Sequence, residues 1–157
     1  MIWLAPRAIN AASSTTATVY PENALMATIL KSKDAHRNLK TGLELGICAA
    51  TIPNINPGFT LAHNIMPPGY RSSTHSHTKV CRGTYVAKGR IRFFFGPEGA
   101  SQQIIDAEAG DYIYTPVGEI HSQLNLSDTD TAEYTSCYIG ESDRTNLGTI
   151  EAGPAKS

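Results

Sequence analysis

The sequence predicts an all-β fold, a sandwich or a small barrel, on the basis of two observations. From about Leu43 onward, short apolar or alternating runs of residues follow one another at close intervals. Turn-forming Gly, Pro and Asn residues separate these runs, as in Pro67-Pro68-Gly69. Many short strands with frequent turns are typical of sandwiches and barrels, whereas βαβ units need a helix between successive strands.

The first part of the chain has a different pattern. Residues 1–20 are small and rich in Ser, Thr and Ala, which indicates a flexible arm or an edge strand that pairs with a partner. Residues 21–39 form the one segment with a helical pattern. Apolar residues recur there at helical spacing, namely at Leu25, Met26, Ile29 and Leu30. We therefore expect residues 1–40 to form an arm with a short N-terminal helix.

Eight later runs are expected to be strands, because they are rich in β-branched or aromatic residues or alternate between apolar and polar residues. They cover residues 43–50, 59–66, 84–87, 90–95, 103–105, 112–115, 121–126 and 132–139. Residues 41–140 would then form the barrel, and the polar residues 141–157 a mobile C-terminal tail. A chain of 157 residues has room for one such domain with a sizeable core, and is too short for two.

Composition and charge argue against several classes of partner. The formal net charge is −1, and Lys and Arg are scattered, so nothing attracts nucleic acid or an anionic membrane over a distance. No apolar stretch approaches the roughly 20 residues that span a bilayer. The three cysteines are widely spaced and do not suggest a disulfide framework. We therefore expect a cytoplasmic protein that acts on a small molecule.

Three of the five histidines are placed so that they can share one metal ion. His75 and His77 are two residues apart, so on a strand their imidazoles point to the same face. His121 follows the turn Pro116-Val117-Gly118, which would deliver a third imidazole from another strand. Imidazole suits Fe, Zn, Cu and Ni, and three protein ligands leave coordination positions open, as in catalytic sites. Of the other two histidines, His36 is expected at the surface. His63 is expected to be an interior or edge residue whose hydrogen bonds are satisfied.

The residues around these histidines resemble the two signature motifs of the cupin superfamily. The first motif contains a Gly, a His-x-His pair, a Glu and a second Gly, and this chain matches it at Gly69, His75, His77 and Gly89. The second motif is matched at every fixed point, namely Gly110, Pro116, Gly118, His121 and Asn125.

This resemblance implies a double-stranded β-helix, or jelly-roll barrel. It also implies that the metal ligands are His75, His77 and His121, near the interior of the barrel. Many cupins are dimers that exchange N-terminal strands, so a homodimer is expected. Cupins include enzymes, regulators and storage proteins, so the fold alone does not determine the function.

The chain departs from the first cupin motif at the position of the metal-binding Glu, which is Arg82. A guanidinium is always cationic and cannot bind a metal. Three interpretations stay open: Arg82 turns away from the metal, holds an anionic substrate beside it, or pairs with a carboxylate in the barrel wall. The candidate carboxylates are Glu119, Glu133 and Asp111. A fourth metal ligand would have to come from Cys81, at a strand bulge, or from Glu119.

The resemblance and the altered charge together predict a mononuclear three-histidine metalloenzyme that acts on a small anionic or enolisable molecule. An Fe(II)-dependent dioxygenase is favoured, with Zn, Mn or Ni as the other candidate ions. The candidate catalytic residues are Arg82 and Gln123, the latter because it shares the strand parity of His121. Two alternatives stay open, a non-oxidative isomerase, lyase or cyclase and a cupin that binds a small ligand without catalysis.

Overall fold

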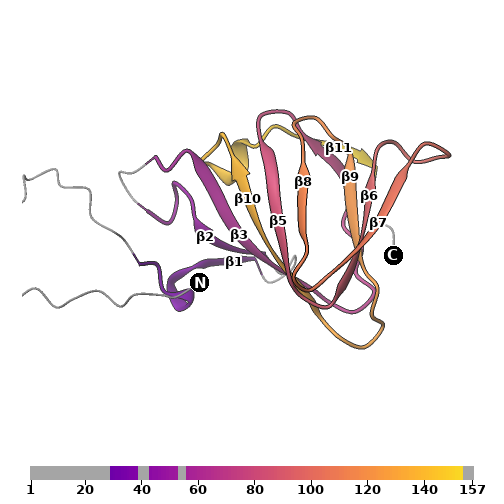
Figure 1. The fold of residues 1–157 in the computed structure, drawn as a ribbon. Helices are drawn as coiled ribbons and strands as arrows, with labels where there is room; N and C mark the ends of the chain where they lie inside the picture. The colour runs from indigo at the N-terminus through magenta and orange to yellow at the C-terminus, as the bar shows by residue number, and fades with distance from the viewer. Residues whose placement is uncertain (1–28, 39–42, 53–55, 154–157) are drawn as a thin grey trace, which may run out of the picture.

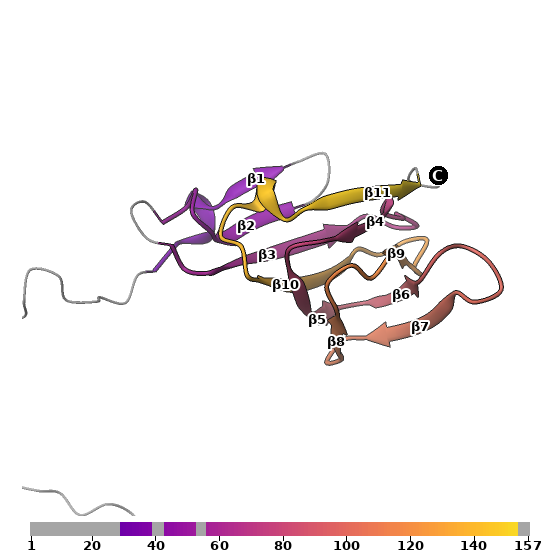
Figure 2. The same ribbon diagram turned by 90° about the horizontal axis from the view of Figure 1, so that it is seen from above.

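The computed structural model describes residues 29–38, 43–52 and 56–153, which form two antiparallel β-sheets that face each other (Figures 1 and 2). The six-stranded sheet has the order β1 (His36–Asn38), β2 (Leu43–Ile47), β3 (Phe59–Met66), β10 (Ala132–Ile139), β5 (Cys81–Lys88) and β8 (Tyr112–Thr115). The five-stranded sheet has the order β11 (Thr149–Gly153), β4 (Thr74–His77), β9 (His121–Asn125), β6 (Arg90–Phe95) and β7 (Gln103–Glu108).

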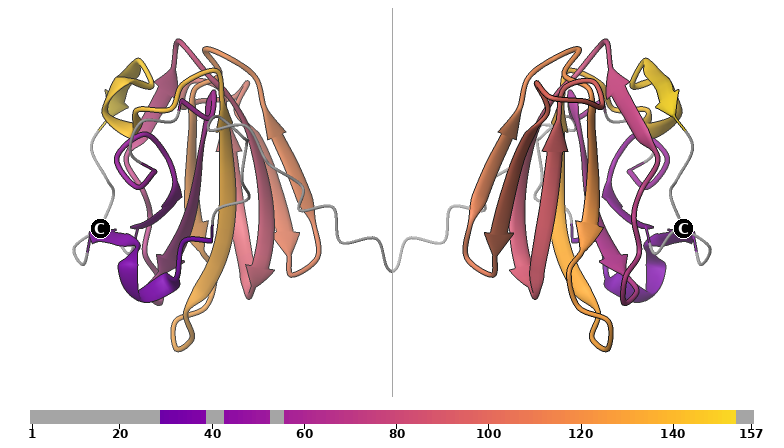
Figure 3. Two further views of the ribbon diagram at one scale, coloured as in Figure 1. Left: turned by 90° about the vertical axis from the view of Figure 1, so that its left-hand side faces the viewer. Right: turned by 90° about the vertical axis from the view of Figure 1, so that its right-hand side faces the viewer.

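The chain passes repeatedly from one sheet to the other. From β3 in the six-stranded sheet it crosses to β4, returns to β5 and crosses again to β6, and the same exchange recurs from β8 to β11. Figure 3 shows the resulting two layers from both sides. Such switching joins the sheets into one jelly-roll barrel. The predicted all-β jelly roll is therefore confirmed.

The core consists of two apolar clusters between the sheets. One cluster contains Met66, Val86, Ile91, Phe93, Phe95, Ala107, Ala132 and Tyr134. The other contains Leu45, Cys48, Ala62, Val80, Tyr138 and Leu147. Burying a side chain as large as Phe93 contributes about 1.5–3 kcal/mol relative to leaving it exposed. Tyr134 and Tyr138 belong to different clusters and line the same cavity, so the cavity lies where the two clusters meet.

The predicted N-terminal helix is wrong for the part of it that is described. Residues 32–34 form the single 3₁₀ turn η1 (Ser32–Asp34), and β1 follows directly. β1 pairs with β2, with His36 opposite Leu45, so strand pairing replaces helical structure here. Residues 21–28, with most of the apolar helical spacing, lie outside the described residues. The limits of the arm therefore stay a prediction.

Residues 141–153, which the sequence places in a C-terminal tail, contain ordered elements. The 3₁₀ turn η2 (Arg144–Asn146) is capped by Asp143, whose carboxylate accepts a hydrogen bond from the Thr145 N–H. β11 follows and pairs antiparallel with β4, the strand of His75 and His77. The sequence prediction missed this strand, and with it one wall of the histidine site.

Most other strands agree with the sequence prediction. β3, β6, β8 and β10 have the predicted limits, whereas β5 begins at Cys81, three residues earlier than predicted. No helix within the described ranges is long and apolar enough to cross a membrane.

Candidate metal centre

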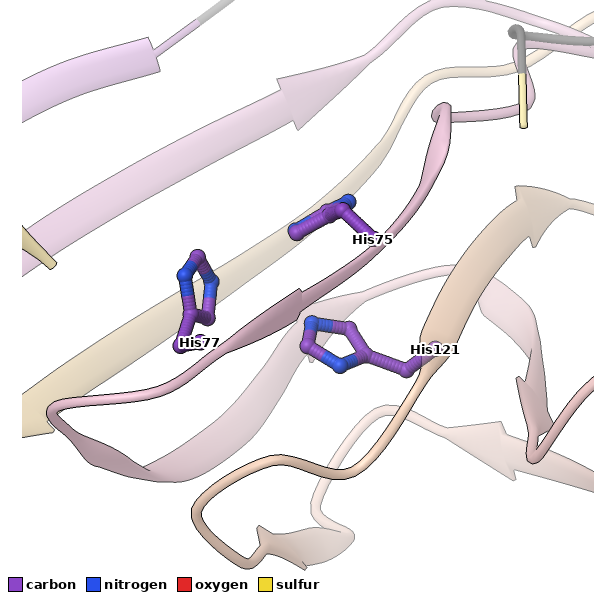
Figure 4. Close-up of side chains that lie close together, drawn as sticks. All are labelled: His75, His77 and His121. Atoms are coloured by element: carbon purple, nitrogen blue, oxygen red, sulfur yellow. The ribbon is translucent and has the colours of Figure 1, made fainter. Parts of the chain in front are cut away.

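Two neighbouring strands of the five-stranded sheet bring the three histidines together (Figure 4). β4 carries His75 and His77, and β9 begins at His121, which is the Cα partner of His75. The ring centroids lie 4.9 Å apart for His75 and His77, 4.5 Å for His75 and His121, and 5.4 Å for His77 and His121. One nitrogen from each ring lies within 4.8 Å of the others. The three rings therefore surround one point, as the sequence spacing predicted.

The turn before His121 is tied to the strand of His77. Gly118 has a φ of 80°, in the left-handed region that glycine adopts at little cost. Its N–H donates to the backbone oxygen of His77 at 2.8 Å. The position of the third imidazole relative to the second is therefore fixed by a backbone hydrogen bond.

Each histidine ring is oriented by a hydrogen bond at Nδ1. Nδ1 of His75 lies 3.0 Å from the Ser73 oxygen, and Nδ1 of His121 lies 2.8 Å from the Glu119 backbone oxygen. A carbonyl oxygen only accepts, so these Nδ1 atoms carry the proton and Nε2 keeps its lone pair. Nδ1 of His77 lies 3.1 Å from Thr149 Oγ1, on β11. Such partners orient metal-binding histidines in known sites.

The Nε2 atoms fit a divalent metal ion. Nε2 of His77 and Nε2 of His121 are buried and have no hydrogen-bond partner. An unpaired buried polar atom costs about 1–3 kcal/mol, which coordination of a cation would recover. All three rings present nitrogen donors on one side, so this chain can hold a metal here with no further protein ligand.

The imidazoles are neutral at physiological pH. Burial, as the largest cause, lowers the pKa of His77 to about 3 and that of His121 to about 2. The pKa of His75 is lowered for the same reason. The positive charge of Arg82 contributes to all three shifts. Neutral rings have the free lone pairs that a metal requires.

A cavity of about 300 Å³ lies between the two sheets beside the histidines. Side chains from both sheets and from the C-terminal segment line it. They are Asn64, Met66, Tyr70, Ser72, Ser73, His75, His77, Arg82, Gln123, Tyr134, Tyr138, Arg144, Thr149 and Glu151. Both candidate catalytic residues of the sequence prediction, Arg82 and Gln123, are among them.

Arg82 is a buried cation without a carboxylate partner in the described part of the chain. Its side chain is 1% exposed, and its one hydrogen bond is a long one of 3.5 Å from Nη2 to Thr115 Oγ1. Its Nε has no partner. The alternative that Arg82 forms an ion pair in the barrel wall is therefore wrong.

None of the three carboxylates proposed for that pair contacts Arg82, whose one side-chain hydrogen bond within the described residues goes to Thr115. Glu133 contacts His63 at 3.2 Å and Lys88 at 3.6 Å. Asp111 accepts a hydrogen bond from the Glu108 N–H at 2.8 Å. Glu119 lines two other hollows, neither of which includes Arg82.

Neither alternative fourth ligand belongs to the histidine cluster. Within the described residues, the group of metal-binding side chains consists of the three histidines alone. Cys81 precedes the inward Arg82 on β5, so it points to the outer face of the sheet, where it raises the pKa of Tyr114. Glu119 contributes its backbone oxygen to His121 instead of its carboxylate. The proposals of Cys81 or Glu119 as ligands are therefore wrong.

The remaining histidines lie away from the cluster. His63 has both ring nitrogens engaged, with Thr135 Oγ1 at 3.3 Å and Glu133 Oε2 at 3.2 Å, so its interpretation as a satisfied residue is confirmed. His36 lies on β1, and its side chain is outside the described part of the structure.

Sequence reasoning missed most of the residues that line the cavity, and four of them bear directly on the site. Tyr134 lies on β10 and Asn64 on β3, and both line the cavity. The alternation of side chains along these strands was the one sequence signal for their direction. Arg144 and Thr149 come from the segment predicted as a tail, where no sequence pattern marks them. Arg144 lies with its guanidinium 5.1 Å from the Tyr138 ring, and its Nε is buried without a partner. The cavity therefore contains two arginines.

Comparison with known proteins agrees with this architecture. The Cupin domain family matches residues 62–138, which include all three histidines and Arg82. No curated protein sequence is a significant match. A structure that addresses the Mn(II) centres of Bacillus subtilis oxalate decarboxylase superposes with a TM-score of 0.65 at 23% identity, covering 81% of this chain and 34% of that one. The same enzyme at pH 4.6 gives a TM-score of 0.65 at 23% identity, covering 84% and 35%.

This chain thus spans about a third of the oxalate decarboxylase chains that it matches. At this identity the similarity concerns the fold. The family match, the two sheets between which the chain alternates and the histidine cluster agree with the motifs in the sequence. Residues 62–138 therefore form a cupin domain, whose three histidines can hold a metal ion.

Proposed function

We propose that the protein is a mononuclear three-histidine enzyme that acts on a small anionic or enolisable molecule, as an Fe(II)-dependent dioxygenase. His75, His77 and His121 would hold the ion. The single observation that supports an anionic substrate is the burial of Arg82 in the same cavity, without a carboxylate partner among the described residues.

The charge of the site supports this choice of substrate. Three neutral imidazoles leave the charge of a divalent ion uncompensated, and Arg82 adds another positive charge. Glu151 is the one carboxylate among the residues that line the cavity, and it is exposed. Two unit charges 4 Å apart attract by about 4 kcal/mol at an effective dielectric constant of 20. An anionic group between the metal and Arg82 would therefore be held strongly, by a charge-assisted bond to the guanidinium.

The reaction type depends on the ion that is bound. Imidazole ligands accept Fe, Mn, Zn and Ni, so the ligand set does not choose among them. A redox-active ion such as Fe(II) would activate dioxygen, while the substrate would supply the electrons and receive both oxygen atoms. The protein residues would bind the anion through Arg82, orient the remainder of the substrate through Gln123, and keep bulk water away.

A second candidate is a non-oxidative lyase that uses Mn(II). The observation that favours it is the structural similarity to the manganese-containing oxalate decarboxylase. This enzyme class would also use an anionic substrate, so the site chemistry does not separate the two candidates. A ligand-binding cupin without catalytic activity is the third outcome to be tested.

The test is anaerobic loading with Fe(II) or Mn(II), followed by parallel assays of oxygen uptake and CO₂ release. The substrates would be β-diketones, hydroxyketones, thiols and small carboxylic acids. Oxygen uptake by the Fe(II) protein alone would support the dioxygenase. CO₂ release by the Mn(II) protein without oxygen uptake would support the lyase. Tight binding without either would indicate a ligand-binding protein.

We also propose a homodimer formed through the outer face of the six-stranded sheet. Tyr112 and Tyr114 are 82% and 68% exposed on β8, and Ile139 is 54% exposed on β10. A largely apolar hollow of about 400 Å³ includes both tyrosines. Sedimentation equilibrium should give twice the mass of the chain, and Y114D should give the monomer mass. A wild-type monomer would contradict the proposal.

A further inference from the structure

Buried polar atoms that lack partners are concentrated at the cavity. Seven side chains of the described part of the chain have such an atom. Those that line the cavity are Asn64, His77, Arg82, Gln123 and Arg144. Leaving a buried donor or acceptor unpaired costs about 1–3 kcal/mol, so this concentration indicates a polar ligand.

These atoms differ in hydrogen-bond polarity. Nδ2 of Asn64, Nε of Arg82 and Nε of Arg144 are donors, and they suit the acceptor oxygens of an anion. Oε1 of Gln123 is an acceptor, and an anion has nothing to donate to it. A ligand that satisfies the whole cavity must therefore carry a hydrogen-bond donor as well as its anionic group.

Gln123 is held in place by a bond between the two sheets. It lies on β9 two residues after His121, on the same face, and is 4% exposed. Its Nε2 donates to the hydroxyl of Tyr134 at 2.8 Å. Tyr134 is itself 4% exposed, on β10 of the opposite sheet. This bond leaves the other end of the amide for the ligand.

The charges around Gln123 favour the orientation in which Oε1 is the free end. The cavity contains the guanidinium groups of Arg82 and Arg144, and the proposed metal would add further positive charge. A carbonyl oxygen, with its partial negative charge, is more stable in that field than an NH₂ group. Tyr134 can accept or donate, so it does not oppose this orientation.

We propose that the ligand of this cavity is a hydroxy-carboxylate, and that Gln123 Oε1 accepts a hydrogen bond from its hydroxyl group. This inference rests on the proposed function, because it takes the anionic group to lie near Arg82. Two strand residues advance the backbone by about 7 Å, so Gln123 binds the hydroxyl at a point separate from the histidine cluster. Gln123 is then a specificity-determining residue, which selects hydroxy acids over the same acids without the hydroxyl.

The experiment uses two pairs of acids that differ by one hydroxyl, malate with succinate and lactate with propionate. Their dissociation constants would be measured by calorimetry on the full-length, Mn(II)-loaded protein. Hydroxy acids also chelate metals directly, so a preference in the wild type alone is not sufficient. The informative quantity is the change in that preference in Q123L, which keeps the volume of the side chain and removes its polar atoms.

We expect Q123L to lower the preference for malate and lactate about tenfold, the worth of one buried hydrogen bond. Metal content should stay the same, because Gln123 does not belong to the histidine cluster. Q103L, on the exposed part of β7, is the matched control and should keep the wild-type preference. If Q123L does not fold, Y134F tests the same bond, because it frees the amide to rotate and should lower the preference severalfold.

Two results would overturn the inference, and they are distinguishable. If the acids bind and Q123L and Y134F keep the full wild-type preference, Gln123 does not select the hydroxyl, and the anionic-substrate proposal stands. If none of the four acids binds to metal-loaded protein, the anionic-substrate proposal fails and this inference fails with it.

Discussion

His75 and His121 form the one Cα pair that joins β4 to β9 in the described structure, and their ring centroids lie 4.5 Å apart. The other strand pairs of the two sheets contact each other over three or more residues. The histidine cluster therefore lies at one end of a pairing that continues before β4, where the Ser72 N–H donates to the Gln123 oxygen and the Asn125 N–H to the Tyr70 oxygen. A metal bound there would join the two strands in addition to its proposed role in catalysis.

The first prediction follows from this junction. A saturating divalent metal should stabilise the fold, because an ion that binds the native state alone adds about 2.7 kcal/mol at 100 times its dissociation constant. Thermal unfolding of chelator-treated protein, with and without Mn(II), measures this effect. H121A should lose the gain, whereas H63A, outside the cluster, should keep it. An equal gain in H121A would place the ion elsewhere.

The second prediction concerns the stability of the metal-free protein at mildly acidic pH. In the folded state the pKa values of His77 and His121 are about 3 and about 2, whereas in the unfolded chain they return to about 6.5. Below pH 6.5 the unfolded chain therefore binds more protons than the folded one, and the free energy of unfolding falls as the pH drops. The contribution of these neutral histidines is complete above pH 6.5.

The measurement is the unfolding temperature of chelator-treated protein at pH 7, 6 and 5. The wild type should lose stability over this range more steeply than the double variant H77Q/H121Q. Parallel curves would show that these two imidazoles are not buried in the neutral form.

The third prediction concerns the charge of the cavity. R82E should bind divalent metal at least tenfold more tightly, because it replaces a repelling cation by an anionic ligand. The same variant should bind small carboxylates at least tenfold more weakly. R90E makes the same change of charge at an exposed residue of β6, and it should alter neither affinity. Equal effects of R82E and R90E would mean that net charge, and not the cavity, is responsible.

The fourth prediction concerns the C-terminal strand. Thr149 Oγ1 lies 3.1 Å from Nδ1 of His77, so T149V removes the group that orients this ring. Loss of such a partner typically costs 10–100-fold in metal affinity, and about tenfold is expected here. I150T, at a residue that is 56% exposed on the same strand, is the control. Unchanged affinity in T149V would show that β11 does not support the site.

Much of the fold and the histidine cluster could be predicted because their signals are local. His75 and His77 are two residues apart on a strand, and Gly118 makes the turn before His121, so the sequence contains the geometry directly. The cupin motifs then connect these local features. Gln123 shares the parity of His121, and it does line the cavity.

The features that could not be predicted depend on pairing between segments that are distant in the sequence. β5 was predicted to begin at Thr84 because a buried Arg82 interrupts the apolar alternation that marks a strand. β11 was missed because four of its five residues are exposed, so it has no alternating pattern of burial. Its pairing with β4 defines it as a strand. The bond from Gln123 to Tyr134 joins two sheets, and sequence parity does not show which residues meet across them.

The three-histidine metal centre is tested most directly by the number of metal ions bound per chain. We expect one Mn(II) or Fe(II) per chain in anaerobically loaded wild type, measured by elemental analysis after gel filtration. H75A, H77A and H121A should each retain far less, while H63A retains one. Loading of the three variants equal to that of the wild type would contradict the three-histidine metal centre.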